Sequence, residues 1–339
     1  MLFQKHFLLI CHALLVIAEE PVLQRMKIPG VGFSLTPDYG VAAIYYKNGT
    51  WAEVARVEGS STYSAMMRKA PSTKVPNKHS SWPLITEVIC PVLDTFKPRL
   101  CKQTPDIESV KDLLQSLKAA VASHLGTTFC YAQIALPDRE WTYQANVVTL
   151  ALHSVRLHSI ISIVDEARMA FWGSELAASG RPETDDTRSI LVVNYSESGL
   201  SASLLAEDMG IVDVMRRSRD ESLGAKNRAQ PNHQKQVKAF LEKIMERPFG
   251  NDYFGQPMHE DLGKTVLHSD AIRDAEFLET FRSAIGSELS NAHGLDPVFA
   301  AAVGAAIIGY DRMDDWQFTP MPALGCTWLS GLYIDKGEL

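Results

Sequence analysis

The chain is short of positive charge, of cysteine and of long apolar runs. Its formal net charge is −7, and an acidic surface argues against general nucleic-acid binding, which needs a basic footprint. The fractions of hydrophobic residues, 46%, and of charged residues, 22%, are ordinary for a globular protein and argue against wholesale disorder. No tandem repeat is present, and 339 residues are enough for two lobes with substantial cores.

The most distinctive apolar run lies at the N-terminus. Lys5 and His6 precede an apolar block over 7–18, which ends in small or branched residues before a possible cleavage point after Ala18. This layout is typical of a secretory signal peptide, and the block is too short to span a bilayer comfortably. We therefore expect 1–18 to be a signal peptide, the chain to enter the secretory pathway (endoplasmic reticulum or secreted), and no stable transmembrane span. The alternatives are a buried N-terminal helix or a misplaced start codon, with a cytoplasmic location.

The remaining cysteines are few and widely spaced: Cys90, Cys101, Cys130 and Cys326. In an oxidising compartment an even number permits disulfides, and Cys90–Cys101 closes the shortest loop. Free thiols in the core are equally compatible with four cysteines in a chain of this size. Their spacing is not that of a zinc site, so no metal site is predicted.

Two segments match the N-glycosylation sequon, Asn48-Gly49-Thr50 and Asn194-Tyr195-Ser196. The second lies on a central polar turn of the chain. Modification there would be hard to reconcile with a ligand cleft.

That central stretch, 190–206, reads as a strand, a tight turn and a returning strand. Its continuous apolar run at 190–193 suits a strand buried on both faces, and the small polar residues at 194–199 suit a loop that lies against a ligand. A second copy of the pattern lies near the N-terminus, where Asn48-Gly49 is a strong hairpin signal. It comprises strands over 31–35, 41–46 and 51–57, with a polar first turn over 36–40.

The rest of the chain alternates between helical and strand patterns. Helices are predicted over 105–125, 141–158, 165–178, 236–246, 275–285 and 296–309. Further strands are predicted over 127–136, 160–164, 210–215 and 265–267. The polar segments at 58–89, 179–186, 216–235 and 247–263 read as surface loops or linkers. The pattern predicts an α/β protein with lobe I at 19–186, lobe II at 187–310, and a C-terminal tail, 311–339, that packs back on the body.

Six stretches resemble, in the right order, the ATPase domain of seventy-kilodalton heat-shock chaperones, within the actin–hexokinase superfamily. VGFSLTPDYGVAAIYYKNGTWAEV resembles the family's opening, V-G-I-D-L-G-T-T-Y-S-x-V with a strand ending in K-N-G, and TTFCYAQIALPDR resembles a later strand. ILVVNYSESGLSASLL is similar to the second phosphate loop, D-L-G-G-G-T-x-D-V-S-L, and DESLGA to D-x-x-L-G-G after it. VLHSDAIRDAEFLETFRSAIG resembles the adenosine loop and its helix, and DPVFAAAVGAA the last connecting helix.

The resemblance implies a two-lobed actin-like ATPase fold, with mixed-sheet lobes and helices around a central cleft. Between Gly224 and His268 the family has a much longer insertion that forms a wall of the adenine pocket. Lobe II is therefore expected to be shortened. The substrate-binding domain that follows in full-length chaperones has no counterpart in the sequence.

The first phosphate loop departs from the family pattern. Ser34 stands where the family has the Asp that organises Mg²⁺ and the attacking water. Thr36 and Pro37 replace the Gly and Thr that contact phosphates, and a proline removes a backbone donor. Hydrolysis of ATP is therefore not expected.

The second phosphate loop and the adenosine loop depart in the same way. Asn194 replaces an Asp, and side chains replace the glycines of both loops, at Ser196, Glu197, Ser198, His268 and Ser269. These side chains would crowd the space where backbone N–H groups cradle phosphate, and the carboxylate of Glu197 would repel a polyphosphate. Gly224 keeps its family identity.

We therefore interpret the chain as a heat-shock-chaperone-like pseudo-ATPase that acts as a non-hydrolysing binding or scaffold protein, without a cofactor and with an unidentified small-molecule or protein partner. One alternative is an enzyme that has reused the interlobe cleft for a non-nucleotide small molecule. Its polar groups would come from Asp38, Glu197, His268 and Asp270. A second alternative is a weak ATP or ADP binder without turnover.

Other polar clusters carry less weight. His153 and His158 are five residues apart on a predicted helix, about 140° around its axis, which is poor geometry for a shared metal. Asp165 and Glu166 could act in acid–base chemistry if they face the cleft, but short polar residues at strand ends are usually caps. The basic run at 216–219 reads as a solvated turn.

Overall fold

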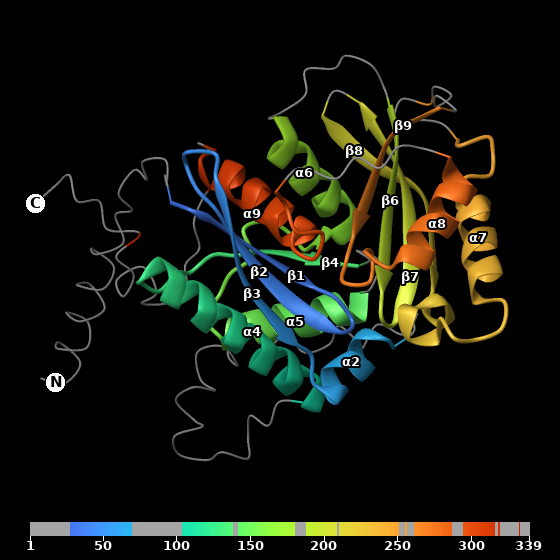
Figure 1. The fold of residues 1–339 in the computed structure, drawn as a ribbon. Coiled ribbons are helices and arrows are strands. Elements are labelled where there is room, and N and C mark those ends of the chain that lie inside the picture. The colour runs from blue at the N-terminus through green and yellow to red at the C-terminus, as the bar shows by residue number, and fades with distance from the viewer. Residues whose placement is uncertain are drawn as a thin grey trace, which may run out of the picture.

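The computed structural model describes residues 28–69, 104–137, 142–179, 188–208, 210–250, 255, 261–286, 294–315, 318 and 332. The predicted signal peptide, the predicted Cys90–Cys101 pairing and most of the C-terminal tail lie outside these residues. Cys130 is disulfide-bonded, so it is not a free core thiol. The α/β class is confirmed, with two mixed sheets that fit a two-lobed arrangement (Figure 1).

Lobe I is built on a five-stranded sheet. The first three strands form an antiparallel meander, and the last two add in parallel beside β1. The strand order is β3 (Trp51–Glu58), β2 (Tyr39–Tyr45), β1 (Gly30–Leu35), β4 (Gln133–Leu136) and β5 (Val164–Asp165). β1 is buried throughout, including Ser34.

Lobe II repeats that order with four strands. Its antiparallel meander corresponds to β1–β3, and β9 pairs in parallel with β6 as β4 does with β1. The order is β8 (Ile211–Asp220), β7 (Gly199–Asp208), β6 (Arg188–Ser196) and β9 (Leu262–His268). The two strand–turn–strand patterns of the sequence are therefore equivalent elements of two sheets.

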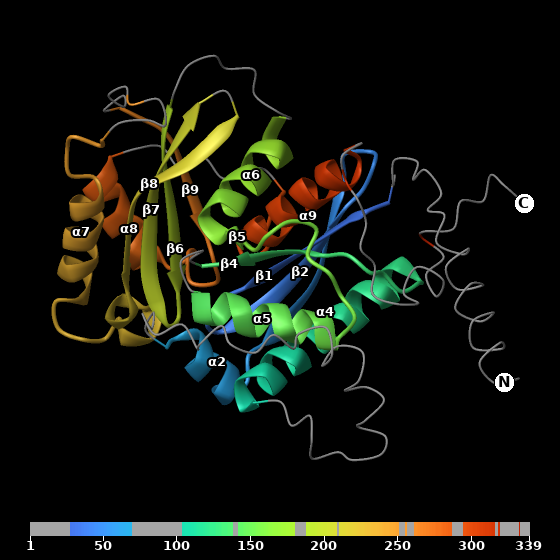
Figure 2. The ribbon, with the colours of Figure 1, turned by 180° about the vertical axis from the view of Figure 1, so that it is seen from behind.

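Helices cover the outer faces of both sheets, as the two ribbon views show (Figures 1 and 2). In lobe I these are α2 (Ser61–Met67), α4 (Pro105–Leu125) and α5 (Thr142–Ser154). In lobe II they are α7 (His233–Ile244) and α8 (Ala275–Ile285), with short 3-10 turns η1 (Glu221–Leu223) and η2 (Ala225–Asn227). Each set closes a separate apolar core against its own sheet.

Two further helices, α6 (Glu166–Ser179) and α9 (Ala300–Met313), lie side by side between the sheets (Figure 1). α6 follows β5 of lobe I but contacts β6, β8 and β9 of lobe II, whereas α9 follows lobe II and packs on β1, β2 and β4. A Cβ at Gly304 would lie 1.9 Å from the carbonyl oxygen of Met169, so α9 can approach α6 this closely only with glycine there. The central core thus joins both lobes.

The alternation of side chains along the strands decides which residues face this centre. On β1, Val31, Phe33 and Leu35 enter the outer core of lobe I, so Ser34 faces the centre. On β6, Ile190 and Val192 enter the central core, and Asn194 follows them on the same face. On β9, Val266 enters the central core, and His268, two residues further, lies on the same face.

Several element predictions are wrong. Of the strand predicted over 160–164, only Val164 lies in a strand, β5. Residues 61–67, predicted as surface loop, form α2, which buries Tyr63 and Met66 behind a Ser60 N-cap. The helix predicted over 141–158 ends at Ser154, because Arg156 takes a left-handed conformation with φ 57°. The strand predicted to end at residue 215 continues to Asp220, so the basic run at 216–219 is not a turn. Of the predicted tail, Phe318 and Leu332 pack against apolar clusters of the body.

Candidate functional site

The turns that open the two lobes touch each other. The hydroxyl of Ser198, in the β6–β7 turn, donates a hydrogen bond to the Asp38 carboxylate in the β1–β2 turn. The other carboxylate oxygen of Asp38 pairs with Arg68, just after α2. Two positions predicted to line an interlobe cleft therefore bind one another directly.

The β1–β2 turn is held in shape by its own lobe. The Thr36 hydroxyl oxygen accepts hydrogen bonds from the backbone N–H of Tyr39 at 3.1 Å and of Asp38 at 3.3 Å. The buried Tyr63 hydroxyl donates to the carbonyl oxygen of Thr36 at 2.7 Å. Pro37 is buried within this turn, and its ring supplies no N–H.

The β6–β7 turn is braced from outside by the segment that follows β8. A Cβ at Gly224 would lie 2.3 Å from the backbone nitrogen of Gly199 and 2.5 Å from the carbonyl oxygen of Glu197. The same carbonyl accepts a hydrogen bond from the Lys226 N–H at 3.1 Å. The Ser196 hydroxyl donates to the Gly199 carbonyl oxygen at 3.2 Å. Glu197 itself is exposed.

A small cavity lies between the sheets, with a volume of about 30 Å³. This is room for about two water molecules. It is lined by Pro137, Glu166, Ala167, Val192, Asn194, Ser201, Ser203, Arg217, Arg219 and His268. Pro137 directly follows β4 of lobe I, Glu166 and Ala167 begin α6, and the other residues come from lobe II. The cavity therefore lies at the junction of both lobes.

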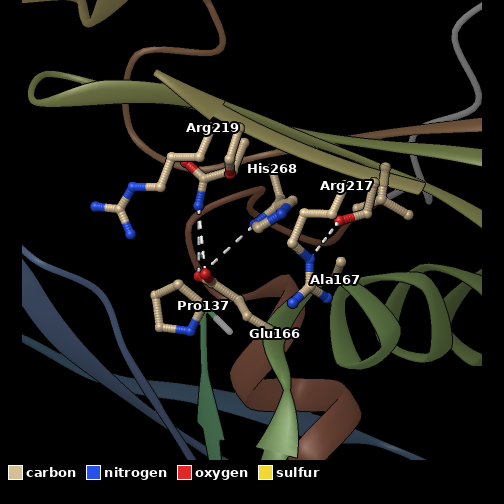
Figure 3. A pocket seen from close by; sticks show the side chains of 10 residues that line it. Pro137, Glu166, Ala167, Arg217, Arg219 and His268 are labelled. Atoms are coloured by element: carbon tan, nitrogen blue, oxygen red, sulfur yellow. Dashed lines mark hydrogen bonds and ion pairs between the residues drawn. The ribbon is translucent and has the colours of Figure 1, made fainter. Parts of the chain in front are cut away.

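Glu166, the first residue of α6, is the central carboxylate of this cavity (Figure 3). It accepts long hydrogen bonds from the Ser34 hydroxyl of lobe I at 3.4 Å and from the Asn194 amide of lobe II at 3.5 Å. Burial, together with the neighbouring Asp165 carboxylate, raises the pKa of Glu166 to about 7, against the opposing effect of Arg219 and of these two donors. The group can therefore exchange a proton near neutral pH.

His268 points toward Glu166 from the end of β9 (Figure 3), with its Nδ1 4.0 Å from the carboxylate oxygen Oε1. It pairs in register with Asn194 across the parallel β6–β9 strands. Burial lowers the pKa of the His268 imidazole to about 4, so the ring is neutral at pH 7. A protonatable carboxyl and a neutral imidazole thus share one small cavity.

The basic run on β8 serves two faces of that strand. Arg217 and Arg219 line the cavity, while Arg216, on the opposite face, donates to the carbonyl oxygens of Ile244, Glu246 and Pro248 at the end of α7. Arg217 also pairs with Asp165. The sequence predicts a solvated turn here instead. When both faces of a strand are polar, the alternation of apolar and polar residues disappears and the strand resembles a loop.

Three further candidate residues, Asp165, Ser269 and Asp270, do not line the cavity. Asp165 caps α6 by accepting from the Ala167 N–H at 3.0 Å, as the cap interpretation predicts. Asp270 pairs with Arg56 of lobe I at 3.0 Å and does not line the cavity. Ser269, with φ 102°, lies 3.2 Å from the Tyr39 hydroxyl. Of the predicted polar groups for a reused cleft, only His268 reaches the cavity.

The predicted geometry of His153 and His158 is also wrong. Because α5 ends at Ser154 and the chain turns at Arg156, the two rings meet edge to face with centroids 5.2 Å apart. His158 also lies against Tyr131. Among the described residues, no group of three or more His, Cys, Asp or Glu side chains is arranged to hold a metal ion.

Within the part of the chain that the structure describes, no helix is both long enough and apolar enough to cross a membrane. Comparison with models of known protein families and with curated proteins gives no match.

Proposed function

We propose that the chain is a pseudo-ATPase of the heat-shock-chaperone type, with an actin-like fold and a shortened lobe II. The repeated strand order of the two sheets supports this proposal, since β3-β2-β1-β4 in lobe I corresponds to β8-β7-β6-β9 in lobe II. The packing of α6 and α9 supports the proposal further, because each helix contacts the sheet of the other lobe. Both features agree with the order of motifs in the sequence.

The contact between Ser198 and Asp38 is the observation that carries the loss of nucleotide chemistry. It joins the two turns that correspond to the phosphate loops, so protein atoms occupy the place between them. A cavity of about 30 Å³ is also far below the roughly 300 Å³ or more of an ordinary ligand pocket.

The function that follows is that of a non-hydrolysing binding or scaffold body, whose partner is a protein or a small molecule and which needs no cofactor. Contacts between the lobes keep this body in one closed arrangement. We further propose that it acts in the secretory pathway. The disulfide at Cys130 supports that location, since disulfides persist in oxidising compartments.

Calorimetric titration of the purified full chain with Mg·ATP and with Mg·ADP tests the proposal. We expect no binding tighter than about 1 mM, and native mass spectrometry should find no nucleotide travelling with the protein from its own host. Stoichiometric binding of either nucleotide would contradict the proposal. Binding without turnover would instead favour the weak-binder alternative.

The pair formed by Glu166 and His268 favours a second candidate, an enzyme that reuses the interlobe cleft for a non-nucleotide small molecule. Because the cavity beside this pair is only about 30 Å³, such a molecule would enter it when the lobes open. A carboxyl with a pKa of about 7 next to a neutral imidazole is suited to proton transfer. Under this hypothesis a small molecule copurifies with the wild-type chain and is lost from Glu166→Gln. Asp270→Asn, which changes a carboxylate outside the cavity, should keep it. If all three proteins are empty, this candidate is excluded in favour of the scaffold.

A further inference from the structure

One of the two sequons of the chain lies at the tip of an exposed hairpin. Asn48 and its neighbours 47–50 are exposed and connect β2 to β3. The turn closes through hydrogen bonds from the Gly49 N–H to the Tyr46 carbonyl oxygen at 3.0 Å, and from the Tyr46 N–H to the Thr50 carbonyl oxygen at 2.9 Å. Gly49 has φ 83°, a left-handed conformation that suits glycine.

Within this turn the sequon residues are already in contact. The Thr50 hydroxyl donates to the side-chain carbonyl oxygen of Asn48 at 2.7 Å, and the Thr50 N–H donates to the same oxygen at 3.1 Å. These two bonds fix the Asn48 amide through its oxygen. Both bonds end on the oxygen of the Asn48 amide and leave the geometry at its nitrogen Nδ2, to which a glycan would be attached, unchanged.

The turn also lies far from the interlobe cavity. β2 runs from Tyr39, at the β1–β2 turn near lobe II, to Tyr45, beside the β2–β3 turn, and its seven residues span about 20 Å. Figure 1 shows the β2–β3 turn at the end of lobe I away from lobe II. A bulky group on Asn48 would therefore extend away from both lobes.

The second sequon is in the opposite situation. The Asn194 amide lines the cavity and donates to Glu166 at 3.5 Å. The hydroxyl of Ser196 is buried and engaged with Gly199. A cavity of about 30 Å³ has no room for a sugar, so a glycan on Asn194 is incompatible with this fold.

We propose that Asn48 is an N-glycan acceptor in the secretory pathway and that Asn194 is not. The co-reactant is a lipid-diphosphate-linked oligosaccharide. Nδ2 of Asn48 forms a bond to the anomeric carbon of the first sugar, the bond from that carbon to the diphosphate oxygen breaks, and Nδ2 loses one proton. The lipid diphosphate leaves with the bonding electron pair. The inference rests on the proposed secretory location but not on the absence of nucleotide chemistry.

Expression of the full chain in a eukaryotic host, followed by glycopeptide mass spectrometry of membrane-protected and secreted material, tests the inference. We expect a glycan on the Asn48 peptide, removed by an amidase that leaves Asp at that position. Asn48→Gln and Thr50→Ala should each abolish the mass increase. Thr50→Ser, which keeps the hydroxyl, should retain it. Asn194→Gln should leave the glycan mass of the chain unchanged.

Three outcomes would overturn the inference. The first is a chain recovered from the secretory fraction with an unmodified Asn48, and the second is a glycan on Asn194 of the folded protein. A chain found wholly in the cytosol would overturn it as well, together with the proposed location. That last result would leave the pseudo-ATPase proposal intact, because nucleotide binding is measured separately on the purified protein.

Discussion

The two lobes share a strand order but stabilise their first turns in different ways. In lobe I the β1–β2 turn is held by side chains of its own lobe, above all Thr36, Tyr63 and Arg68. In lobe II the β6–β7 turn is short and rests on the backbone around Gly224. Equivalent positions of the two sheets therefore carry turns that respond to different kinds of substitution.

The two turns can meet because they present complementary polar groups. The lobe I turn presents a carboxylate, Asp38, whose second oxygen is neutralised within its lobe by Arg68. The lobe II turn presents a hydroxyl, Ser198, at the tip of its hairpin. A donor and an acceptor are thus brought together at the place where a phosphate-binding protein needs two sets of backbone donors.

The largest effect is expected where both lobes depend on one close contact. Gly304→Val should lower the free energy of unfolding by about 3 kcal/mol or more, because the new side chain would meet the backbone of Met169. Urea denaturation measures the loss. Gly309→Ala is the matched control on the same helix, since its Cβ would meet the movable end of the Ile160 side chain. Equal losses in both variants would contradict the account of the helix contact.

The cavity pair predicts opposite pH dependences in two variants. The pKa of Glu166 rises from 4.5 to about 7 on folding, so the folded state binds more protons and this group's contribution to stability falls as pH rises through that interval. The pKa of His268 falls from 6.5 to about 4, so its contribution to stability rises with pH between those values. In the wild type the two effects largely cancel from about pH 4.5 to about pH 6.5.

In Glu166→Gln only the effect of His268 remains, so the free energy of unfolding should rise with pH over that interval by about 1–3 kcal/mol. In His268→Asn only the effect of Glu166 remains, so the free energy of unfolding should fall by a similar amount. Urea denaturation at a series of pH values measures both slopes. Slopes of the same sign in the two variants would contradict the assigned directions of the pKa shifts. A wild-type slope as steep as either variant would contradict their cancellation.

The contact between the turns is expected to be smaller but specific. In a double-mutant cycle, Asp38→Asn and Ser198→Ala should show a coupling energy of about 1–2 kcal/mol in the free energy of unfolding. The control cycle combines Ser198→Ala with Asp270→Asn, which changes a carboxylate paired with Arg56 instead. A coupling of zero in the first cycle would refute a direct bond between the lobes.

The smallest effect is expected at the outer edge of the interface. Arg56 pairs with Asp270 and lies over the Tyr39 ring at 4.1 Å from its centroid, but its side chain is 34% exposed. Arg56→Gln should cost about 0.5–1 kcal/mol, less in high salt. Arg312→Gln, which removes a surface pair within one segment at 3.9 Å, should cost almost nothing. Thermal unfolding at two salt concentrations separates them.

The sequence predicts much of the fold because its apolar periodicity is strong at the elements that pack most tightly. The helices at 105–125 and 275–285 are confirmed at both ends, each behind a side-chain N-cap. The predictions at 61–67 and 216–220 are wrong for a shared reason. A short helix with one capping serine, and an edge strand with polar groups on both faces, lack the apolar contrast on which the prediction depends.

The site was predictable only in part. Ser34, Asn194 and His268 were identified by the resemblance, and they meet around one carboxylate. The sequence indicates Glu166 only as an acid–base candidate or a cap. Its burial follows from the packing of α6 between two sheets, which the local sequence does not predict. The approach of Asp38 to Ser198, separated by 160 positions, depends on the relative placement of the lobes, which no local pattern encodes.

Measurement of the interlobe distance by electron spin resonance tests directly whether the contact between the two turns keeps the lobes closed. Spin labels on genetically encoded residues at the exposed positions Ala119 of α4 and Ala239 of α7 would leave the native cysteines untouched. If the turns hold the lobes closed, we expect a single narrow distance distribution that neither Mg·ATP nor Mg·ADP changes. A second, longer distance in the free protein, or a shift on adding nucleotide, would contradict a cleft closed by its own turns.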